Sequence, residues 1–109
     1  MDFNEYQKQA LKTAIYPNLG ANLQYPTLGL CGETGEVAEL VKKSIRDEGG
    51  EVSPERREKL IKELGDVLWY CAMLAHELRV PLSTVAEHNI QKLADRKARN
   101  TIHGDGDER

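Results

Sequence analysis

Apolar residues recur along the chain with the three- and four-residue spacing of amphipathic helices, and no segment alternates as a strand does. Four helices are predicted: from about Asp2 to Ile15, from about Thr27 to Gly49–Gly50, from Ser53 to about Leu78, and from 81–83 to about Arg99. The pattern therefore predicts an all-α fold. We expect a single four-helix bundle-like domain over residues 1–99 and a loop-like tail over residues 100–109.

Capping residues support these boundaries. Asp2 and Ser53 are typical N-caps, and Pro54 suits the first position of a helix. Pro17 ends the first predicted helix, and a Gly-Gly pair ends the second. Residues 16–26 are rich in Asn, Gly and Pro and are predicted to form a loop.

The helix over 53–78 is apolar on nearly every side between Val67 and Ala75. One stripe suits the core, and Trp69 and Met73 point away from it. This stripe consists of Leu60, Leu64, Val67, Cys71, Leu74, Ala75 and Leu78. A helix that is apolar all round is buried all round, which so small a monomer cannot achieve. We therefore expect this helix to join copies into a homodimer or homotetramer. The alternative is that Trp69 packs beneath a loop or the tail.

Composition limits the class of protein. The chain has 109 residues, of which 30% are charged, and a net charge of −3, so it lacks the basic surface that a nucleic-acid polymer needs. No apolar run has the length of a membrane span, and no secretory leader is present, so no membrane partner is expected. Cys31 and Cys71 fall at small apolar helical positions. We read them as free, buried thiols, which fits a cytoplasmic protein.

Two acidic pairs carry the chemistry, Glu33 with Glu36 and Glu63 with Asp66. Each pair has i,i+3 spacing, so both of its carboxylates share one helix face. Four carboxylates converging from two helices repel one another unless a cation lies between them. Ligands that are all oxygen suit Mg²⁺ or Mn²⁺ rather than zinc. The sequence therefore predicts a divalent-metal site.

The alternative is that these acids are solvated and form i,i+4 ion pairs, as Glu55 and Lys59 are placed to do. The first acidic pair has no basic residue at that spacing. In addition, Gly35 and Gly65 lie inside the two helices, where glycine costs about 1 kcal/mol relative to alanine. We read these glycines as a sign that a ligand or another backbone approaches closely.

The segments GETGEVAELVKK and KELGDVLWY resemble the MazG-like all-α nucleoside triphosphate pyrophosphohydrolases, and the resemblance extends from about Leu28 to Arg96. It implies that the two acidic pairs bind Mg²⁺, with Mn²⁺ as a possible substitute. It also implies an enzyme that cleaves a (deoxy)nucleoside triphosphate to the monophosphate and pyrophosphate. One glutamate, which the sequence does not single out, would act as general base. Such enzymes clear or rebalance nucleotide pools, and the short stand-alone form also fits versions that phages encode.

Other residues are expected to contact the nucleotide. Asn89, Lys92 and Arg96 share one face of the last helix, and the resemblance favours a phosphate or sugar contact for them over a solvated helix rim. Tyr70 is the best candidate for a wall of the nucleoside pocket. Glu39 either adds a ligand or proton acceptor to the acidic series or pairs with Lys43 at the surface. Lys43 is also a weaker candidate for a phosphate contact.

Two other functions stay open. One is a non-catalytic helical module that binds nucleotides or joins partners. The other keeps the fold and the reaction but uses a narrower substrate, such as phosphoribosyl-ATP. The tail over 100–109 is either a frayed end or a segment that closes over a bound nucleotide.

Overall fold

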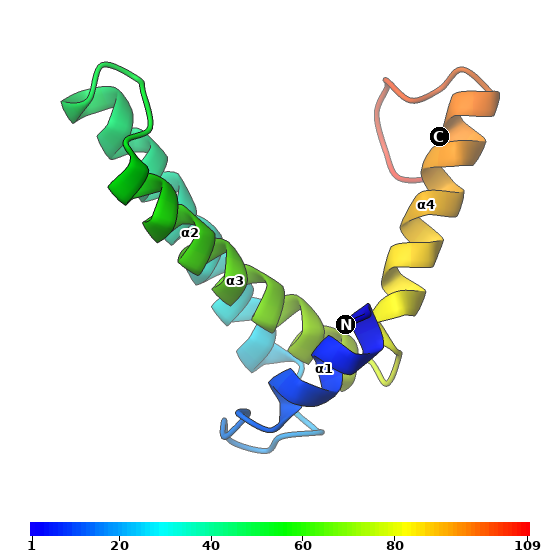
Figure 1. The fold of residues 1–109 in the computed structure, drawn as a ribbon. Coiled ribbons are helices and arrows are strands. Elements are labelled where there is room, and N and C mark those ends of the chain that lie inside the picture. The colour runs from blue at the N-terminus through cyan, green and yellow to red at the C-terminus, as the bar shows by residue number, and fades with distance from the viewer.

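A computed structural model describes residues 1–109 and contains four helices and no strand (Figure 1). The helices are α1 (Phe3–Leu11), α2 (Gln24–Asp47), α3 (Pro54–Glu77) and α4 (Leu82–Ala98). The all-α prediction and the order of the four helices are confirmed. None of the helices combines the length and the apolar character needed to cross a bilayer.

The predicted N-caps are observed. The Asp2 carboxylate accepts a hydrogen bond from the Glu5 amide at 2.7 Å, and the Ser53 hydroxyl accepts one from the Arg56 amide at 3.2 Å. Pro54 lies in the first turn of α3, where its missing N–H costs no helical hydrogen bond.

Two boundaries differ from the prediction. Helix α1 stops at Leu11 instead of Ile15, because the Ala10 carbonyl accepts bonds from the Thr13 hydroxyl and the Trp69 indole and the chain continues as a turn. Helix α2 starts three residues early, and the Asn22 side chain accepts a hydrogen bond from the Tyr25 amide in its first turn. The spacing of apolar residues along the chain does not predict side-chain hydrogen bonds of this kind.

Helices α2 and α3 form an antiparallel hairpin across the Gly49–Gly50 turn, where φ is +65° and +86° (Figure 1). Glycine adopts these angles without the penalty that a side chain adds. Arg56 braces the hairpin, because it pairs with the Glu48 carboxylate and donates to the Leu40 carbonyl at 3.2 Å. The hairpin places the two acidic pairs on neighbouring helices.

Helix α4 diverges from this hairpin, so that the chain has the shape of a V (Figure 1). Helix α2 packs only on α3, and no Cα of α2 lies within 8 Å of one in α4. The radius of gyration is 16.7 Å, whereas a compact domain of this length has about 13 Å. The expected bundle is therefore open within one chain.

The core is small and lies where α1 crosses α3. Met73 is fully buried, and Trp69 packs on this core and donates its indole N–H to the Thr13 hydroxyl at 2.9 Å. The face with Trp69 and Met73, which the sequence assigned to self-association, is thus covered by α1 of the same chain. By contrast, Leu64 and Leu78 of the predicted core stripe are 61% and 56% exposed. The prediction is therefore wrong for Leu64, Leu78, Trp69 and Met73, whereas Ala75 of the predicted stripe is buried in the core.

The single chain leaves much apolar surface in contact with water. Its accessible area is 7902 Å², whereas a folded monomer of this mass exposes about 6,100 Å². The exposed apolar side chains lie on all four helices and include Phe3, Leu28, Val41, Ile45, Ile61, Leu64, Leu68, Val85, Ile90 and Leu93. Unpartnered apolar faces of this extent are typical of chains that associate.

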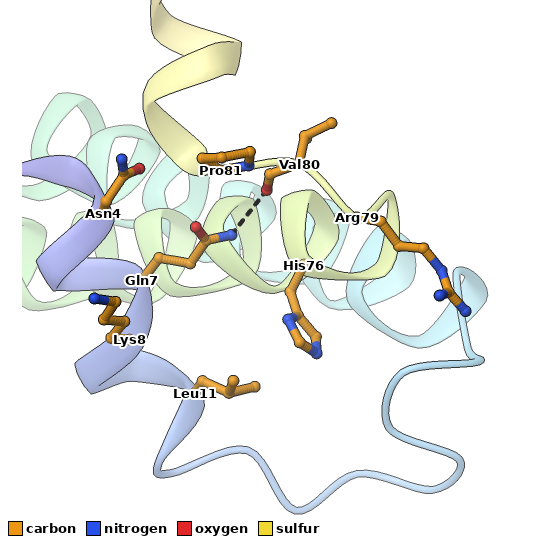
Figure 2. A pocket seen from close by; sticks show the side chains of 8 residues that line it. All are labelled: Asn4, Gln7, Lys8, Leu11, His76, Arg79, Val80 and Pro81. Atoms are coloured by element: carbon orange, nitrogen blue, oxygen red, sulfur yellow. Dashed lines mark hydrogen bonds between the residues drawn. The ribbon is translucent and has the colours of Figure 1, made fainter.

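Side chains of α1 fix the start of α4. Gln7 donates to the Val80 carbonyl at 3.2 Å and accepts from the Leu82 amide at 2.9 Å, and Asn4 accepts from the Ser83 amide at 3.1 Å. These bonds satisfy amides at the N-terminus of α4, which has no cap of its own. A hollow of about 400 Å³ lies beside Gln7, and none of the four acids lines it (Figure 2).

The loop before α2 is held by Glu77. Its carboxylate accepts hydrogen bonds from the Gly20 amide at 2.8 Å and the Asn22 amide at 2.6 Å. Desolvation by itself would raise the pKa of Glu77, but these hydrogen bonds stabilise the charged carboxylate more strongly. The pKa of Glu77 is therefore lowered. Desolvation and the nearby Glu77 charge also raise the pKa of Tyr16 to about 12. Tyr16 is buried beneath this loop.

We expect Glu77→Gln to lower the free energy of unfolding at pH 7 by about 1–3 kcal/mol, because the bonds to Gly20 and Asn22 lose their charge. A lowered pKa stabilises the fold above the unfolded-state value and loses that effect as the pH falls through the folded-state value. Urea unfolding should therefore show a difference between wild type and variant that shrinks from pH 7 towards pH 3. Glu87→Gln, at an exposed position of α4, is the control. A difference that does not vary with pH would contradict this role.

Both cysteines are free, as predicted, but only Cys71 is partly buried. Cys31 is exposed on α2, which corrects the expectation of two buried thiols. Desolvation raises the pKa of the Cys71 thiol.

Candidate active site

Three of the four predicted metal ligands converge. Glu33 on α2 and Glu63 and Asp66 on α3 each offer a carboxylate oxygen, and these oxygens all lie within 4.8 Å of one another. We call these residues the acidic cluster. Glu33 and Glu63 are partly buried, whereas Asp66 is exposed. The antiparallel hairpin brings Glu33 of the first i,i+3 pair close to both members of the second pair.

The acidic cluster has no cation of its own. No Lys or Arg nitrogen lies within 4.0 Å of its carboxylates, although Glu48 and other acids of the chain are paired. The pKa of Glu33 is raised, mainly by desolvation. The neighbouring carboxylates of Glu63, Asp66 and Glu36 raise it further. Carboxylates that repel one another without a counter-charge are the donor set that a hard divalent ion prefers. The residues therefore fit the metal that the sequence predicted.

The remaining acids of α2 lie outside the cluster. Glu36 is exposed and is not among the converging oxygens, although its charge reaches Glu33. Glu39 pairs with Lys42 at 2.8 Å and approaches Lys43 at 3.9 Å. This arrangement favours the surface interpretation of Glu39 and leaves Lys43 two turns beyond Glu36.

One tyrosine, Tyr70, lies close to the acidic cluster. It is one turn after Asp66 on α3, and its ring packs against Gly29, one turn before Glu33 on α2. Desolvation, followed by the charges of Tyr25, Glu33 and Asp66, raises the pKa of Tyr70. The rings of Tyr16 and Tyr25 stack with centroids 4.8 Å apart. Tyr70 is thus positioned as a wall beside the acids, whereas Tyr16 is a buried packing residue.

Among the glycines of α2 and α3, only Gly29 is approached closely by another side chain. The sequence by itself did not single out this glycine. A Cβ at Gly29 would lie 2.2 Å from a ring carbon of Tyr70. At Gly35 and Gly65, by contrast, no atom beyond the neighbouring backbone of the same helix lies within 4 Å of that position. The close approach inferred for these two glycines is therefore absent inside one chain, and the space beside them is open. The only signal at Gly29 was a glycine inside a helical pattern.

We expect Gly29→Ala to reduce stability by about 1–2 kcal/mol, because the clash with Tyr70 outweighs the gain of about 1 kcal/mol in helix propensity. Gly32→Ala is the matched control one turn along α2, where the added methyl meets nothing and should stabilise the protein. Urea unfolding of both variants tests the pair. Equal stabilisation by the two alanines would show that Tyr70 moves aside at no cost.

The predicted phosphate-contacting residues lie on α4, away from the acidic cluster. Asn89 and Lys92 are exposed, whereas Arg96 is buried. Helix α4 diverges from the α2–α3 hairpin beyond the turn that joins it to α3, and it does not contact α2 (Figure 1). Lys92 and Arg96 both bind Asp107 of the tail instead.

Comparison with known proteins identifies the family of this chain. The MazG nucleotide pyrophosphohydrolase domain matches residues 23–100, which contain the acidic cluster and all of α4. The Gene 37 protein of Mycobacterium phage L5 is 49% identical over 114 residues, and the match covers 100% of both chains. No solved structure gives a significant match. The chain therefore belongs to the MazG nucleotide pyrophosphohydrolase family.

Proposed function

We propose that this protein hydrolyses (deoxy)nucleoside triphosphates to the monophosphate and pyrophosphate with the help of Mg²⁺, for which Mn²⁺ can substitute. The observation that carries the proposal is the acidic cluster of Glu33, Glu63 and Asp66, which has no counter-charge. Family membership supports the reaction class. We place the activity in the cytoplasm, where it would clear or rebalance nucleotide pools.

The chain's residues would divide the work. Glu33, Glu63 and Asp66 would hold the ion, with Glu36 completing its shell from the next turn of α2. When bound, the ion would offset the charge of the triphosphate and make a coordinated water more acidic. A glutamate of this group would orient that water and accept its proton. Tyr70 would support the nucleoside beside the acids.

We further propose that each site is shared by two copies of the chain. The chain exposes about 1,800 Å² more than a compact monomer would, which is enough to form a large, stable interface. The exposed apolar side chains Leu64 and Leu68 lie on the same segment of α3 as Glu63 and Asp66. In this arrangement α4 of one copy lies against the hairpin of its partner, and Asn89, Lys92 and Arg96 meet the phosphates there.

A pyrophosphate-release assay with the eight common NTPs and dNTPs tests the function, with Mg²⁺, with Mn²⁺ and with EDTA. We expect metal-dependent release, strongest with deoxynucleotides. If none of the eight is cleaved, phosphoribosyl-ATP is the next substrate to test. Binding of nucleotide without cleavage of any substrate would identify a non-catalytic module and contradict the proposal.

A further inference from the structure

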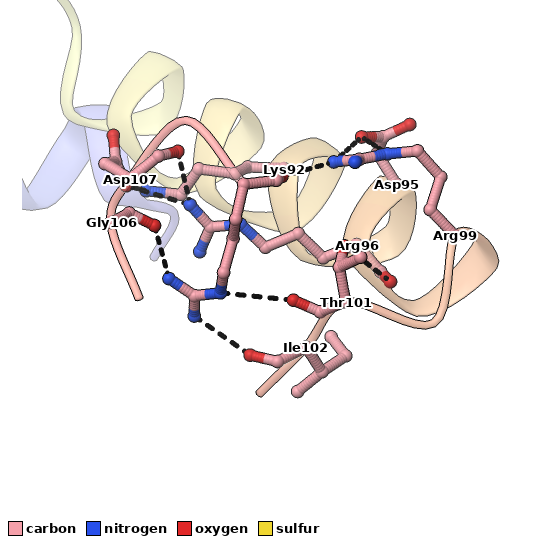
Figure 3. A network of polar contacts seen from close by, with 9 residues as sticks. Lys92, Asp95, Arg96, Arg99, Thr101, Ile102, Gly106 and Asp107 are labelled. Carbon is pink, nitrogen blue, oxygen red and sulfur yellow. Dashed lines mark hydrogen bonds and ion pairs between the residues drawn. The ribbon is translucent and has the colours of Figure 1, made fainter. Parts of the chain in front are cut away.

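The C-terminal tail folds back along α4 and is not a frayed end. Asn100 has a φ of +57°, so the chain reverses directly after the helix. The Thr101 amide donates to the Arg96 carbonyl at 2.7 Å. Gly104 and Gly106 also have positive φ angles and continue the reversal. The tail therefore returns towards the middle of α4 (Figure 3).

Where the tail returns to α4, the Asp107 carboxylate pairs with Lys92 and Arg96. One oxygen of the Asp107 carboxylate lies 2.8 Å from Lys92 Nζ and 3.0 Å from Arg96 Nη2. Arg96 Nη2 also donates to the Asp107 backbone carbonyl at 2.6 Å (Figure 3). Lys92 and Arg96 are one turn apart, so both can hold a single anion. These ion pairs lower the pKa of Asp107, which keeps the carboxylate charged.

Arg96 makes this a formed anion site instead of a chance surface pair. Its side chain is only 6% exposed, and its Nε is buried without a hydrogen-bond partner. A buried guanidinium is costly unless an anion compensates it. A carboxylate and one carbonyl leave the Nε donor unused, whereas a phosphate has enough oxygens to engage several guanidinium donors at once.

The tail itself is weakly held. Residues 102–108 are all exposed, and the contacts that fix the tail are polar. Arg109 donates to the carbonyls of Thr101 and Ile102, and Arg99 donates to the Arg109 carbonyl. Exposed polar contacts of this kind stabilise by about 0–1 kcal/mol each. An anion that binds Lys92 and Arg96 more strongly can therefore release the tail.

We propose that Asp107 is the internal occupant of a phosphate site formed by Lys92 and Arg96, and that a phosphate group of the substrate displaces it. The identity of the displacing ligand as a nucleotide rests on the proposed function. Asp107 then sets how strongly phosphate must bind before the tail opens, and it discriminates against weaker anions.

The test is binding of inorganic pyrophosphate to the full chain in EDTA, measured by calorimetry. In EDTA no divalent ion can link pyrophosphate to the acidic cluster, and binding that Lys92→Ala abolishes is assigned to Lys92 and Arg96. Asp107→Asn removes the carboxylate charge that pairs with both Lys92 and Arg96, and it is expected to tighten binding roughly three- to tenfold. Asp105→Asn is the matched control, since Asp105 is an acid of the same tail without a bond to α4.

A second measurement follows the tail directly. The heteronuclear NOE of the Gly104 and Gly106 amides should fall when pyrophosphate is added to wild type, and should already be low in Asp107→Asn. Equal affinities of the variant and wild type within twofold, or a tail unchanged by saturating pyrophosphate, would overturn the proposal. A protein that binds pyrophosphate in this way but cleaves no nucleotide would refute only the proposed function.

Discussion

Glu63→Gln is expected to lower pyrophosphate release at least about a thousandfold, which corresponds to about 4 kcal/mol of transition-state stabilisation. Glu63 is a member of the acidic cluster with Glu33 and Asp66, so Glu63→Gln removes a ligand and part of the negative charge that would hold the ion. The measurement is the initial rate with saturating Mg²⁺ and the best nucleotide. Glu58→Gln is the control on the same helix. It should retain activity within twofold, because Glu58 is exposed and pairs only with Arg57.

Stability measurements separate this result from unfolding. The acidic cluster is a group of like charges without a cation, so Glu63→Gln should leave metal-free protein equally stable or more stable. Added Mg²⁺ should raise the Tm of wild type, because ligand binding favours the native state, and should do so much less in the variant. A folded Glu63→Gln protein with near-normal activity would refute the assignment of the acidic cluster as the metal centre.

Mixing Lys92→Ala with Glu63→Gln is expected to restore pyrophosphate release above the level of either variant alone. Lys92→Ala should weaken substrate binding tenfold or more through loss of a charged phosphate contact, and Glu63→Gln removes the metal site. If α4 of one copy serves the hairpin of the other, a mixed dimer contains one site in which both elements are intact. Random pairing in a dimer then returns about a quarter of wild-type activity. The assay is pyrophosphate release, at low nucleotide concentration, after the two proteins are unfolded and refolded together.

The same experiment can exclude a shared site. If the acids and Lys92 of one chain act together, the mixture gives no more than the mean of the two separate variants. Size-exclusion chromatography should show both variants in the same oligomeric state as wild type. Neither Lys92 nor Glu63 is among the exposed apolar residues expected at the interface. A monomeric wild-type protein would contradict the proposed sharing directly.

Much of this protein can be predicted from its sequence, because the relevant signals are local. Helical spacing and the caps at Asp2 and Ser53 act over a few residues, and they identified four helices in the right order. The acidic cluster was predictable for a similar reason. A short connection with a Gly-Gly turn makes the two helices pack side by side, which brings acids on their facing sides close together. Three of the four carboxylates converge.

Only the tertiary structure decided which faces of these helices meet. Helix α3 is apolar on both sides, so periodicity alone could not tell that α1 covers Trp69 and Met73 while Leu64 stays exposed. The contacts of Tyr70 with Gly29 and of Asp107 with Arg96 join residues that are distant along the chain, and no local pattern encodes them. The sequence determined the helices and the carboxylates because each depends on near neighbours. The partners of each face depend on competition among all the apolar surfaces at once, and that competition is resolved only in three dimensions.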